Sequence, residues 1–185
     1  MQTAWIGFGA NLGDPVVTWE RVLRAVACST SLRLVGVSPL YATEPVGPVA
    51  QPWFTNGVFV VVSRMEPLQL MRFLRRLEWG LGRRRGRERV WGPRKVDLDL
   101  LFLGRRVMTH SRLILPHPRL HERRFVLQPL ADLDGDLLHP VLCKTVDMLL
   151  KEVNDPSRVE RLPWKAPTPL CRGAVTGVIP GASSG

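Results

Sequence analysis

Six apolar segments follow one another along the first 103 residues, and their order limits the fold more than any other feature of the sequence. Short β-branched or alternating runs predict strands, whereas apolar residues spaced three and four apart predict helices. In chain order we predict a strand over 5–9, a helix from 14 to about 26, a strand over 32–41, a strand over 56–63, a helix over 67–79 and a strand over 96–103. This order is that of the ferredoxin-like β-α-β-β-α-β arrangement, in which an antiparallel sheet carries both helices on one face. We therefore predict an α+β fold of this kind, with C-terminal additions.

The length and composition predict a single domain followed by a tail. A chain of 185 residues, 45% of them hydrophobic, is long enough to bury a substantial core. It contains no run of 18 uncharged apolar residues, so we expect no helix that spans a membrane. From about residue 155 onward, prolines, glycines and serines replace any periodic apolar pattern. The predicted organisation is a domain over 1–154 and a weakly ordered tail over 155–185.

The cysteines indicate a reducing environment. Cys28, Cys143 and Cys171 are an odd number at wide spacings, and no C-x-x-C pair occurs. This pattern disfavours a disulfide framework and favours the cytoplasm.

Positive charge is concentrated in one short segment. The formal net charge is +10, and residues 83–95 hold seven basic residues and one acid. Such a patch is either a binding site for a defined anionic ligand or a solvated arginine-rich loop, and charge alone does not separate the two. Guanidiniums such as those of Arg83, Arg85 and Arg94 can hold phosphate oxygens through paired hydrogen bonds.

Two carboxylates, Asp97 and Asp99, alternate with leucines in the last predicted strand. Because alternate side chains of a strand face the same side, these two point one way, about 7 Å apart at the backbone. Mg²⁺ binds carboxylates together with substrate phosphates, so the pair is a candidate metal site. The alternative is a polar strand face whose aspartates pair with arginines. The adjoining arginines favour metal-assisted chemistry on a polyphosphate.

Aromatic and histidine residues are further candidates. Trp91 is expected either to stack on a base or to pack under its loop. Phe54, Asn56 and Phe125 would suit a flat heterocycle, but the same residues would also suit a core and a turn. His117 lies in a Pro-His-Pro sequence beside several arginines, which is either part of the anion site or a rigid turn on a basic surface.

Sequence motifs of other nucleotide-binding and metal-binding proteins are absent, and two other classes of protein match the sequence less well. The sequence has no Walker A loop, no kinase signature and no H-E-x-x-H zinc motif. A basic ferredoxin-like domain can bind RNA on its sheet, but Asp97 and Asp99 would repel a phosphate backbone without metal. A nucleotidyltransferase would also use paired aspartates, and only its products would distinguish it.

Several motifs together resemble the 6-hydroxymethyl-7,8-dihydropterin pyrophosphokinase family over about residues 4–150. The matching sequences are G-A-N-L-G-D at 9–14, Y-A-T-E-P-V-G-P at 41–48, W-G-P-R-K-V-D-L-D at 91–99, P-H-P-R at 116–119 and R-R-F-V-L at 123–127. Ala10 stands where serine is usual, and Val90 separates an arginine from the tryptophan. The resemblance implies transfer of the terminal diphosphate of ATP to a pterin hydroxymethyl group, with release of AMP, in folate biosynthesis.

The resemblance also implies roles for individual residues. Two Mg²⁺ ions would bind Asp97 and Asp99, and the catalytic set would be Asp97, Asp99, Arg83 and Arg94. ATP would contact Arg75, Glu78, Arg85, Trp91, Leu100, Arg112, His117 and Arg123. The pterin would contact Thr43, Pro45, Val46, Phe54, Asn56, Asp97 and Phe125. We expect a cytoplasmic monomer that binds ATP and a reduced pterin but neither nucleic acid nor a membrane.

Overall fold

The structure is a computed structural model that describes residues 1–85 and 92–165. Its elements, in chain order, are β1 (Gln2–Ala10), α1 (Pro15–Ala27), β2 (Leu32–Val37), β3 (Tyr41–Thr43), β4 (Phe54–Ser63), α2 (Pro67–Gly80), β5 (Asp97–Leu103), β6 (Met108–His110), β7 (Leu113–Leu115), the 3-10 helix η1 (Leu120–Glu122), α3 (Arg124–Asp134), α4 (Val146–Glu152) and β8 (Val159–Arg161). The predicted α+β class is confirmed. No helix in the described ranges is long and apolar enough to cross a membrane.

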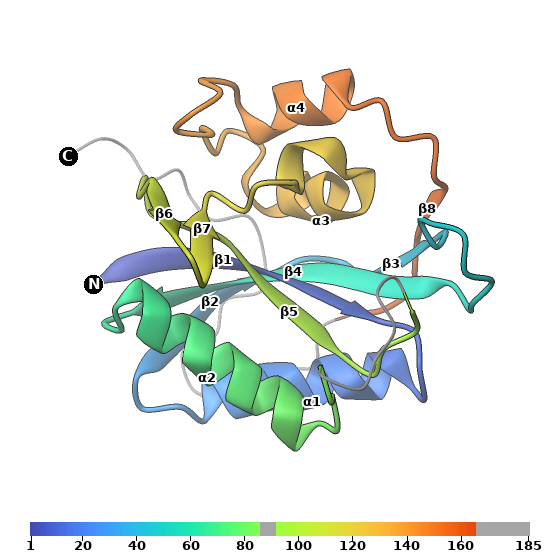
Figure 1. The fold of residues 1–185 in the computed structure, drawn as a ribbon, viewed down its shortest axis with the longest axis horizontal. Coiled ribbons are helices and arrows are strands. Elements are labelled where there is room, and N and C mark those ends of the chain that lie inside the picture. The colour runs from blue at the N-terminus through green and yellow to red at the C-terminus, as the bar shows by residue number, and fades with distance from the viewer. Residues whose placement is uncertain (86–91, 166–185) are drawn as a thin grey trace.

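An antiparallel sheet lies at the centre of the fold (Figure 1). Its strands run in the order β5-β1-β4-β3-β8, and β2 also pairs with β4, beyond the part of β4 that pairs with β3. We predicted a single strand over 32–41, and the structure divides it into β2 and β3. Pro39 explains the break, because proline has no N–H to give to a sheet ladder.

The sheet is covered on both faces. Helices α1 and α2 lie on one face, and α3 lies on the other with α4 packed against it (Figure 1). The side chains of β1 divide accordingly: Ile6 and Phe8 join the core under α1 and α2, whereas Trp5 joins the core under α3.

Local sequence explains how α1 begins. Asp14 is the N-cap, and its carboxylate accepts a hydrogen bond of 3.0 Å from the backbone N–H of Val17. Pro15 occupies the first turn, where its missing N–H costs nothing. This start was predicted from the sequence and is confirmed.

The C-terminal segment corrects the predicted domain boundary. Residues 159–161 form β8, which pairs with β3, and the backbone N–H of Leu162 donates to the carbonyl of Leu40 at 2.8 Å. The Trp164 ring then packs edge-on against Trp19, with 5.9 Å between ring centroids. The domain therefore continues to at least residue 165, and a boundary at 155 is too early. A short, exposed strand between two prolines carries no periodic signal. The rest of the predicted tail, 166–185, lies outside the described residues.

Candidate active site

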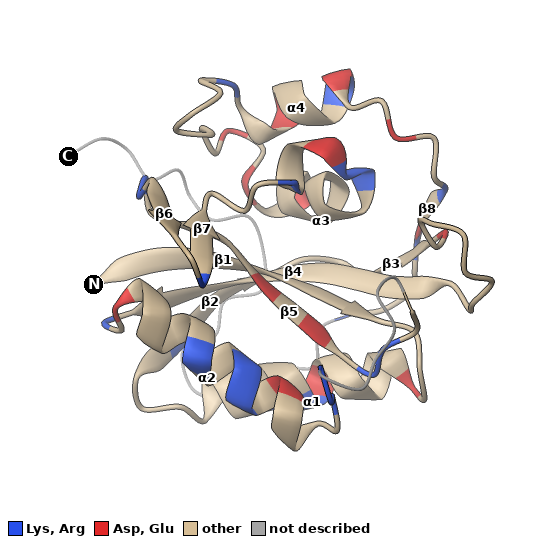
Figure 2. Ribbon diagram, in the orientation of Figure 1, with Lys and Arg blue, Asp and Glu red and all other residues tan. Residues whose placement is uncertain are grey.

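Strand β5 places Asp97 and Asp99 on the sheet face that α3 partly covers. Leu98 and Leu100 between and after them point into the opposite core, as the alternation predicts. The two acidic positions stand out on β5, with basic residues on α2 nearby (Figure 2). Both carboxylates line a cavity of about 610 Å³.

Glycines on β1 form part of the cavity floor. Gly9 lies between Asp97 on β5 and Asn56 on β4, and Gly7 likewise neighbours Asp99. Because neither glycine has a side chain, the strand leaves open space between the acidic residues and β4. The sequence predicted a strand over 5–9 but gave its two glycines no role in the site, so their place there was missed. The alternation Gly-Phe-Gly on a buried strand was the available signal.

The arginines converge on Asp97. Arg83 donates to the Oδ1 atom of Asp97, Arg94 donates to Oδ2 at 2.5 Å, and Arg85 reaches Oδ1 at 3.3 Å. Burial by itself would raise the pKa of Asp97, but the hydrogen bond and charge of Arg83, with Arg94 and Arg85, hold it below its ordinary value. Asp97 is therefore ionised at neutral pH.

Asp99 has a different environment. No hydrogen bond or ion pair reaches its carboxyl group from the described part of the chain. Burial, followed by the negative charge of Asp97, raises the pKa of Asp99 to about 6. A divalent cation beside both carboxylates would relieve this repulsion, so the donor pair fits Mg²⁺, which binds few carboxylates and completes its shell with other oxygens. Among the described residues no cluster of three or more acidic, histidine or cysteine side chains exists that could hold a metal by itself.

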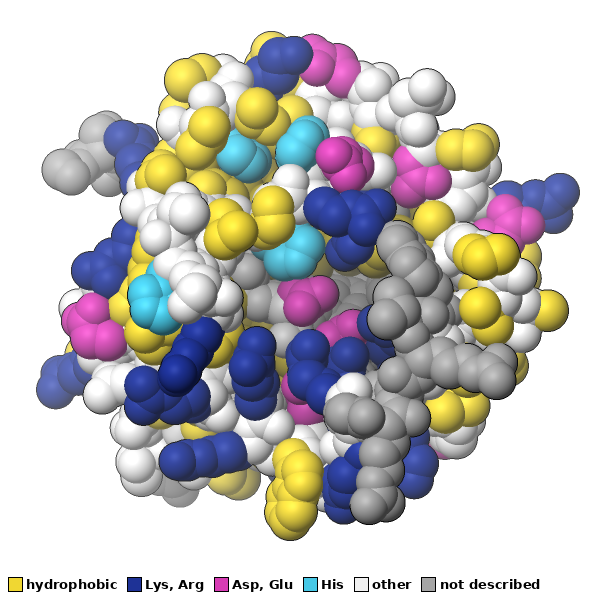
Figure 3. Space-filling view, viewed as in Figure 1, with side chains coloured by type: hydrophobic (Ala, Val, Ile, Leu, Met, Phe, Trp, Pro, Cys, Tyr) yellow, Lys and Arg dark blue, Asp and Glu magenta, His cyan; other side chains and the backbone are white. Residues whose placement is uncertain are grey.

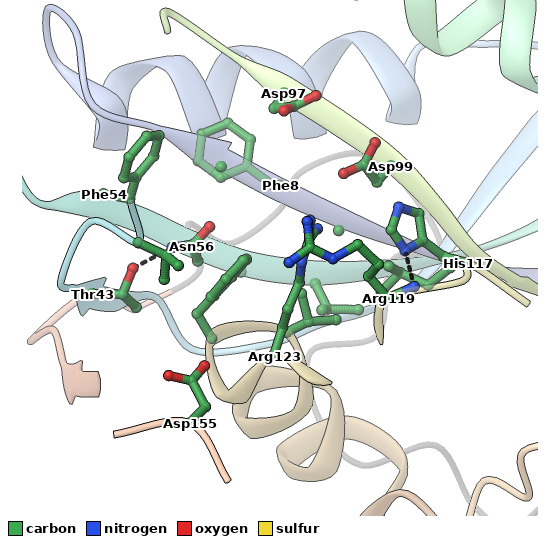
Figure 4. A pocket seen from close by; sticks show the side chains of 18 of the residues that line it. Phe8, Thr43, Phe54, Asn56, Asp97, Asp99, His117, Arg119, Arg123 and Asp155 are labelled. Atoms are coloured by element: carbon green, nitrogen blue, oxygen red, sulfur yellow. Dashed lines mark hydrogen bonds between the residues drawn. The ribbon is translucent and has the colours of Figure 1, made fainter. Parts of the chain in front are cut away.

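His117 lies beside Asp99 in the view of Figure 4, and Arg123 extends into the cavity from the start of α3. The backbone N–H of His117 donates to the carbonyl of Leu101 at 2.9 Å, which fixes this segment beside β5. Burial, and then the positive charge of Arg123, lower the pKa of His117 to about 4, so its imidazole is neutral at pH 7. In Figure 3, acidic side chains lie in a hollow that basic side chains border.

The other end of the cavity is more apolar. Phe54 and Phe125 line it, and the amide of Asn56 donates to the Oγ1 atom of Thr43 at 2.6 Å (Figure 4). Guanidiniums join this end to the charged end: Arg94 lies 5.7 Å from the centre of the Phe54 ring, and Arg123 lies 5.6 Å from that of Phe125. The cavity therefore has a charged end, lined by carboxylates and guanidiniums, and an aromatic end.

Residues 5–135 match the family described as 7,8-dihydro-6-hydroxymethylpterin-pyrophosphokinase. This chain belongs to that family.

Relatives of the pyrophosphokinase family are similar over most of their length. The chain is 41% identical over 140 residues to the 2-amino-4-hydroxy-6-hydroxymethyldihydropteridine pyrophosphokinase of Pseudomonas aeruginosa, which is 76% of this chain and 85% of that protein. It is 38% identical over 140 residues to the enzyme of the same name from Haemophilus influenzae, covering 76% of this chain and 86% of that one.

Solved structures agree on the fold. Plasmodium falciparum HPPK-DHPS with SDX-DHP superposes with a TM-score of 0.64 at 16% identity, over 82% of this chain and 43% of that chain. The same protein with pteroate gives a TM-score of 0.67 at 15% identity, over 82% of this chain and 42% of that one. The chain thus spans less than half the length of these proteins, and the likeness concerns the fold alone.

Most residues that the pyrophosphokinase resemblance singled out meet around this one cavity. Those that line it are Thr43, Val46, Phe54, Asn56, Arg83, Arg85, Arg94, Asp97, Asp99, His117, Arg123 and Phe125. Asp155, which sequence reasoning missed, also lines it from the C-terminal segment.

The remaining predicted residues lie elsewhere. Leu100 is buried in the core under α2, Arg75 is exposed on α2, and Arg112 is exposed between β6 and β7. Pro45 is half-buried beside Val46, and Glu78 is buried behind the arginines. Trp91 lies outside the described residues. For these positions contact with a substrate stays a prediction.

Proposed function

We propose that this chain transfers the terminal diphosphate of ATP to the hydroxymethyl group of 6-hydroxymethyl-7,8-dihydropterin, releases AMP, and so serves folate biosynthesis. The family match and the curated names of its relatives support this reaction. The observation that carries the proposal at the site is a single cavity that joins Asp97, Asp99 and several guanidiniums to an aromatic end.

The charged end suits the phosphates of ATP. Arg83, Arg94 and Arg123 would donate hydrogen bonds to phosphate oxygens, with neutral His117 beside them. Asp97 and Asp99 would hold Mg²⁺, and we propose two ions there. Bound Mg²⁺ would neutralise phosphate charge.

The aromatic end suits the pterin. Phe54 and Phe125 offer apolar ring faces of the kind that bind flat heterocycles. The Asn56 amide, held by Thr43, would hydrogen-bond to the edge of the ring system, and the backbone of 43–46 would contact it further. The hydroxymethyl group would then point toward Asp97, because Arg94 lies against both Phe54 and Asp97.

The chemistry that follows is positioning and charge stabilisation. The hydroxymethyl oxygen attacks the β-phosphorus of ATP in line and releases its proton to water. A new P–O bond forms, and the bond from that phosphorus to the AMP oxygen breaks. The cavity holds the two reactants together, which removes much of the entropic cost of their meeting. Arg83 and Arg94 stabilise the charge that shifts toward the leaving AMP.

The proposal includes a monomer that acts in the cytoplasm and binds neither nucleic acid nor a membrane.

Incubation with ATP, Mg²⁺ and the reduced pterin alcohol tests the proposal. We expect AMP and the pterin diphosphate in equal amounts. Release of inorganic pyrophosphate instead would indicate nucleotidyl transfer, and absence of turnover would contradict the proposal. Asp99→Asn should lower the rate about a thousandfold, equivalent to about 4 kcal/mol of transition-state stabilisation.

A further inference from the structure

Asp155 holds the first turn of α3 from the C-terminal segment. The side chain of Arg123, which precedes the helix, makes no capping hydrogen bond. Instead the Oδ2 atom of Asp155 accepts a hydrogen bond of 2.9 Å from the backbone N–H of Arg124, and the Arg124 guanidinium donates to the Asp155 carbonyl at 3.2 Å. A carboxylate at this place satisfies an N–H group that has no acceptor within the helix, and its charge suits the helix dipole. The cap of α3 therefore comes from a residue 31 positions away in the sequence.

The Asp155 carboxylate is itself held in place. Its Oδ1 atom accepts hydrogen bonds from the backbone N–H and the hydroxyl of Ser157, at 3.0 and 2.5 Å. Burial by itself would raise the pKa of Asp155, but the hydrogen bonds from Ser157 and Arg124, with the charge of Arg124, hold it below its ordinary value. Asp155 is therefore ionised where it lines the cavity (Figure 4), and both of its oxygens accept hydrogen bonds from the chain.

The same C-terminal segment is fixed to β3, which supplies another wall of the aromatic end. The backbone N–H of Glu44 donates to the carbonyl of Arg158 at 3.1 Å, and the backbone N–H of Arg158 donates back to the Glu44 carboxylate at 3.2 Å. Thr43, the last residue of β3, pairs with Val159 of β8. Thr43 and Glu44 both line the cavity. Residues 155–159 therefore join the β3 wall to the start of α3.

Phe125 is the cavity residue that this link positions. It lies in the first turn of α3 and lines the aromatic end. Another contact between β3 and α3, the hydrogen bond of 2.5 Å from the Tyr41 hydroxyl to the Asp132 carboxylate, lies in the last turn of the helix. Asp155 adds a tie at the first turn. Loss of this cap would let Phe125 shift, while the buried apolar side chains of α3 keep the helix on the sheet.

We propose that Asp155 is a positioning residue for the pterin, because it sets the place of Phe125 relative to β3. This inference rests on the proposed function, since it assigns the aromatic end to the pterin. A flat ring gains most from an aromatic side chain at van der Waals separation, so a displaced Phe125 binds the pterin less tightly. The phosphate end is set by Arg83, Arg94 and Asp97, which bind one another on and beside β5. Loss of Asp155 therefore weakens the pterin much more than ATP.

The test measures two dissociation constants for folded Asp155→Ala protein. The first is that of a non-hydrolysable ATP analogue with Mg²⁺, and the second is that of the pterin with the analogue at saturation. We expect the pterin constant to rise about tenfold, which corresponds to the loss of an aromatic contact, and that of the analogue to rise less than about threefold. Asp155→Asn keeps an oxygen that accepts from Arg124, so it should bind the pterin within about threefold of the unmodified protein. A merely structural role would lower the stability of Asp155→Ala and leave both constants unchanged, which would overturn the inference.

Thr145→Ala is the matched control. The Thr145 hydroxyl caps α4 by accepting a hydrogen bond of 3.2 Å from the backbone N–H of Met148, and Thr145 is not among the described residues that line the cavity. This variant removes the same kind of contact from another helix, so both constants should stay within about twofold of their values in the unmodified protein. Equal weakening of the pterin by Thr145→Ala and Asp155→Ala would overturn the inference.

Two variants of Arg124 decide the matter if Asp155→Ala does not fold. Arg124→Ala keeps the backbone N–H and loses only the guanidinium, so pterin binding should weaken less than about threefold. Arg124→Pro removes the N–H that donates to Asp155, and proline suits the first position of a helix after an extended residue such as Arg123. It should weaken pterin binding about tenfold, and equal pterin constants for the two variants would overturn the inference.

The AMP assay separates this role from the reaction itself. An unmodified protein that releases AMP, with an Asp155→Ala variant that binds the pterin normally, would leave the proposed function and remove the role of Asp155. An unmodified protein that makes no AMP would remove both.

Discussion

The carboxylate of Glu78 accepts a hydrogen bond of 2.8 Å from the backbone N–H of Leu98, so α2 is joined to β5 between the two acidic residues of that strand. The same carboxylate accepts hydrogen bonds of 2.8 Å from Arg83 and of 2.9 and 2.7 Å from Arg85. Glu78 is only 1% exposed, and the two guanidiniums compensate its buried charge. One side chain thus fixes both the acidic strand and the arginines that approach it.

Glu78→Gln should destabilise the fold. The amide loses the negative charge that Arg83 and Arg85 compensate, and its NH₂ group cannot accept their hydrogen bonds. Breaking one partner of a buried ion pair leaves the other uncompensated, so we expect the free energy of unfolding to fall by about 3 kcal/mol. Urea unfolding measures this change.

Glu152→Gln is the matched control for this substitution. It breaks the ion pair with Lys144, in which both side chains are largely exposed. Exposed pairs contribute little, so the loss should be below about 1 kcal/mol. Equal losses in the two variants would show that Glu78 does not have the role assigned to it.

A methyl group at Gly9 should impair pterin binding. A Cβ atom there would lie 2.8 Å from the Oδ1 atom of Asn56, so Asn56 must move and its hydrogen bond to Thr43 is disturbed. We expect Gly9→Ala to raise the pterin dissociation constant about tenfold, which corresponds to the loss of roughly one buried hydrogen bond. Calorimetric titration with the pterin measures this.

Gly7→Ala is the comparison for Gly9→Ala. Its added Cβ atom would lie 3.4 Å from the nearest atom of the Leu101 side chain, an ordinary van der Waals contact. Pterin affinity should change much less than in Gly9→Ala. If both alanine variants bind the pterin as well as the unmodified protein does, then the two glycines of β1 at the cavity floor have no part in pterin recognition.

In metal-free protein, Asp99 and His117 should change the pH dependence of the free energy of unfolding in opposite directions. The pKa of Asp99 is raised to about 6, so the folded state binds its proton more tightly than the unfolded state does. The stability that Asp99 contributes is therefore fully present below its unfolded pKa of about 4 and is lost as pH rises through about 6. The pKa of His117 is lowered to about 4, so its contribution is present above about pH 6.5 and is lost as pH falls through about 4.

These two contributions oppose each other between about pH 4 and 6. Asp99→Asn should leave the histidine effect unopposed, so the free energy of unfolding should fall more steeply on acidification. His117→Asn should leave the Asp99 effect, so acidification should destabilise this variant less than the unmodified protein. Urea unfolding at several pH values with a chelator present checks both signs, and parallel profiles for the three proteins would contradict them.

Local sequence predicted the parts of the fold that depend on short-range periodicity. The alternation of Asp97, Leu98 and Asp99 needs only the two-residue repeat of a strand, and β5 forms as predicted. The Asp14 cap needs only the next three residues, and it too was predicted.

Long-range contacts were not predictable in this way. The bonds from Asn11 to Gln51 and to Arg94 span 40 and 83 positions, and no local pattern specifies them. The same holds for β8, whose pairing with β3 depends on a three-residue strand without buried positions. Sequence reasoning therefore identified the residues at the site more readily than the contacts that position them.

Two deletions should separate the role of residues 155–165 from that of residues 166–185. Removal of 166–185 should leave stability and turnover unchanged, because β8 and Trp164 remain. Removal of 155–185 deletes β8, the contact of Trp164 with Trp19, and the backbone hydrogen bond of 3.1 Å from Glu44 to Arg158. Loss of a half-buried tryptophan alone should lower the free energy of unfolding by about 2 kcal/mol.

The longer deletion should also weaken pterin binding for two reasons. It removes Asp155, which lines the cavity, and it takes the outer neighbour from β3, which carries Thr43 at the aromatic end. Trp164→Ala separates the two effects, since it removes the ring but keeps the strand pairing. We expect it to lower stability while the pterin dissociation constant stays close to that of the unmodified protein. If the longer deletion bound the pterin normally, β3 would hold Thr43 in place through β4 alone, and β8 would have no role in the site.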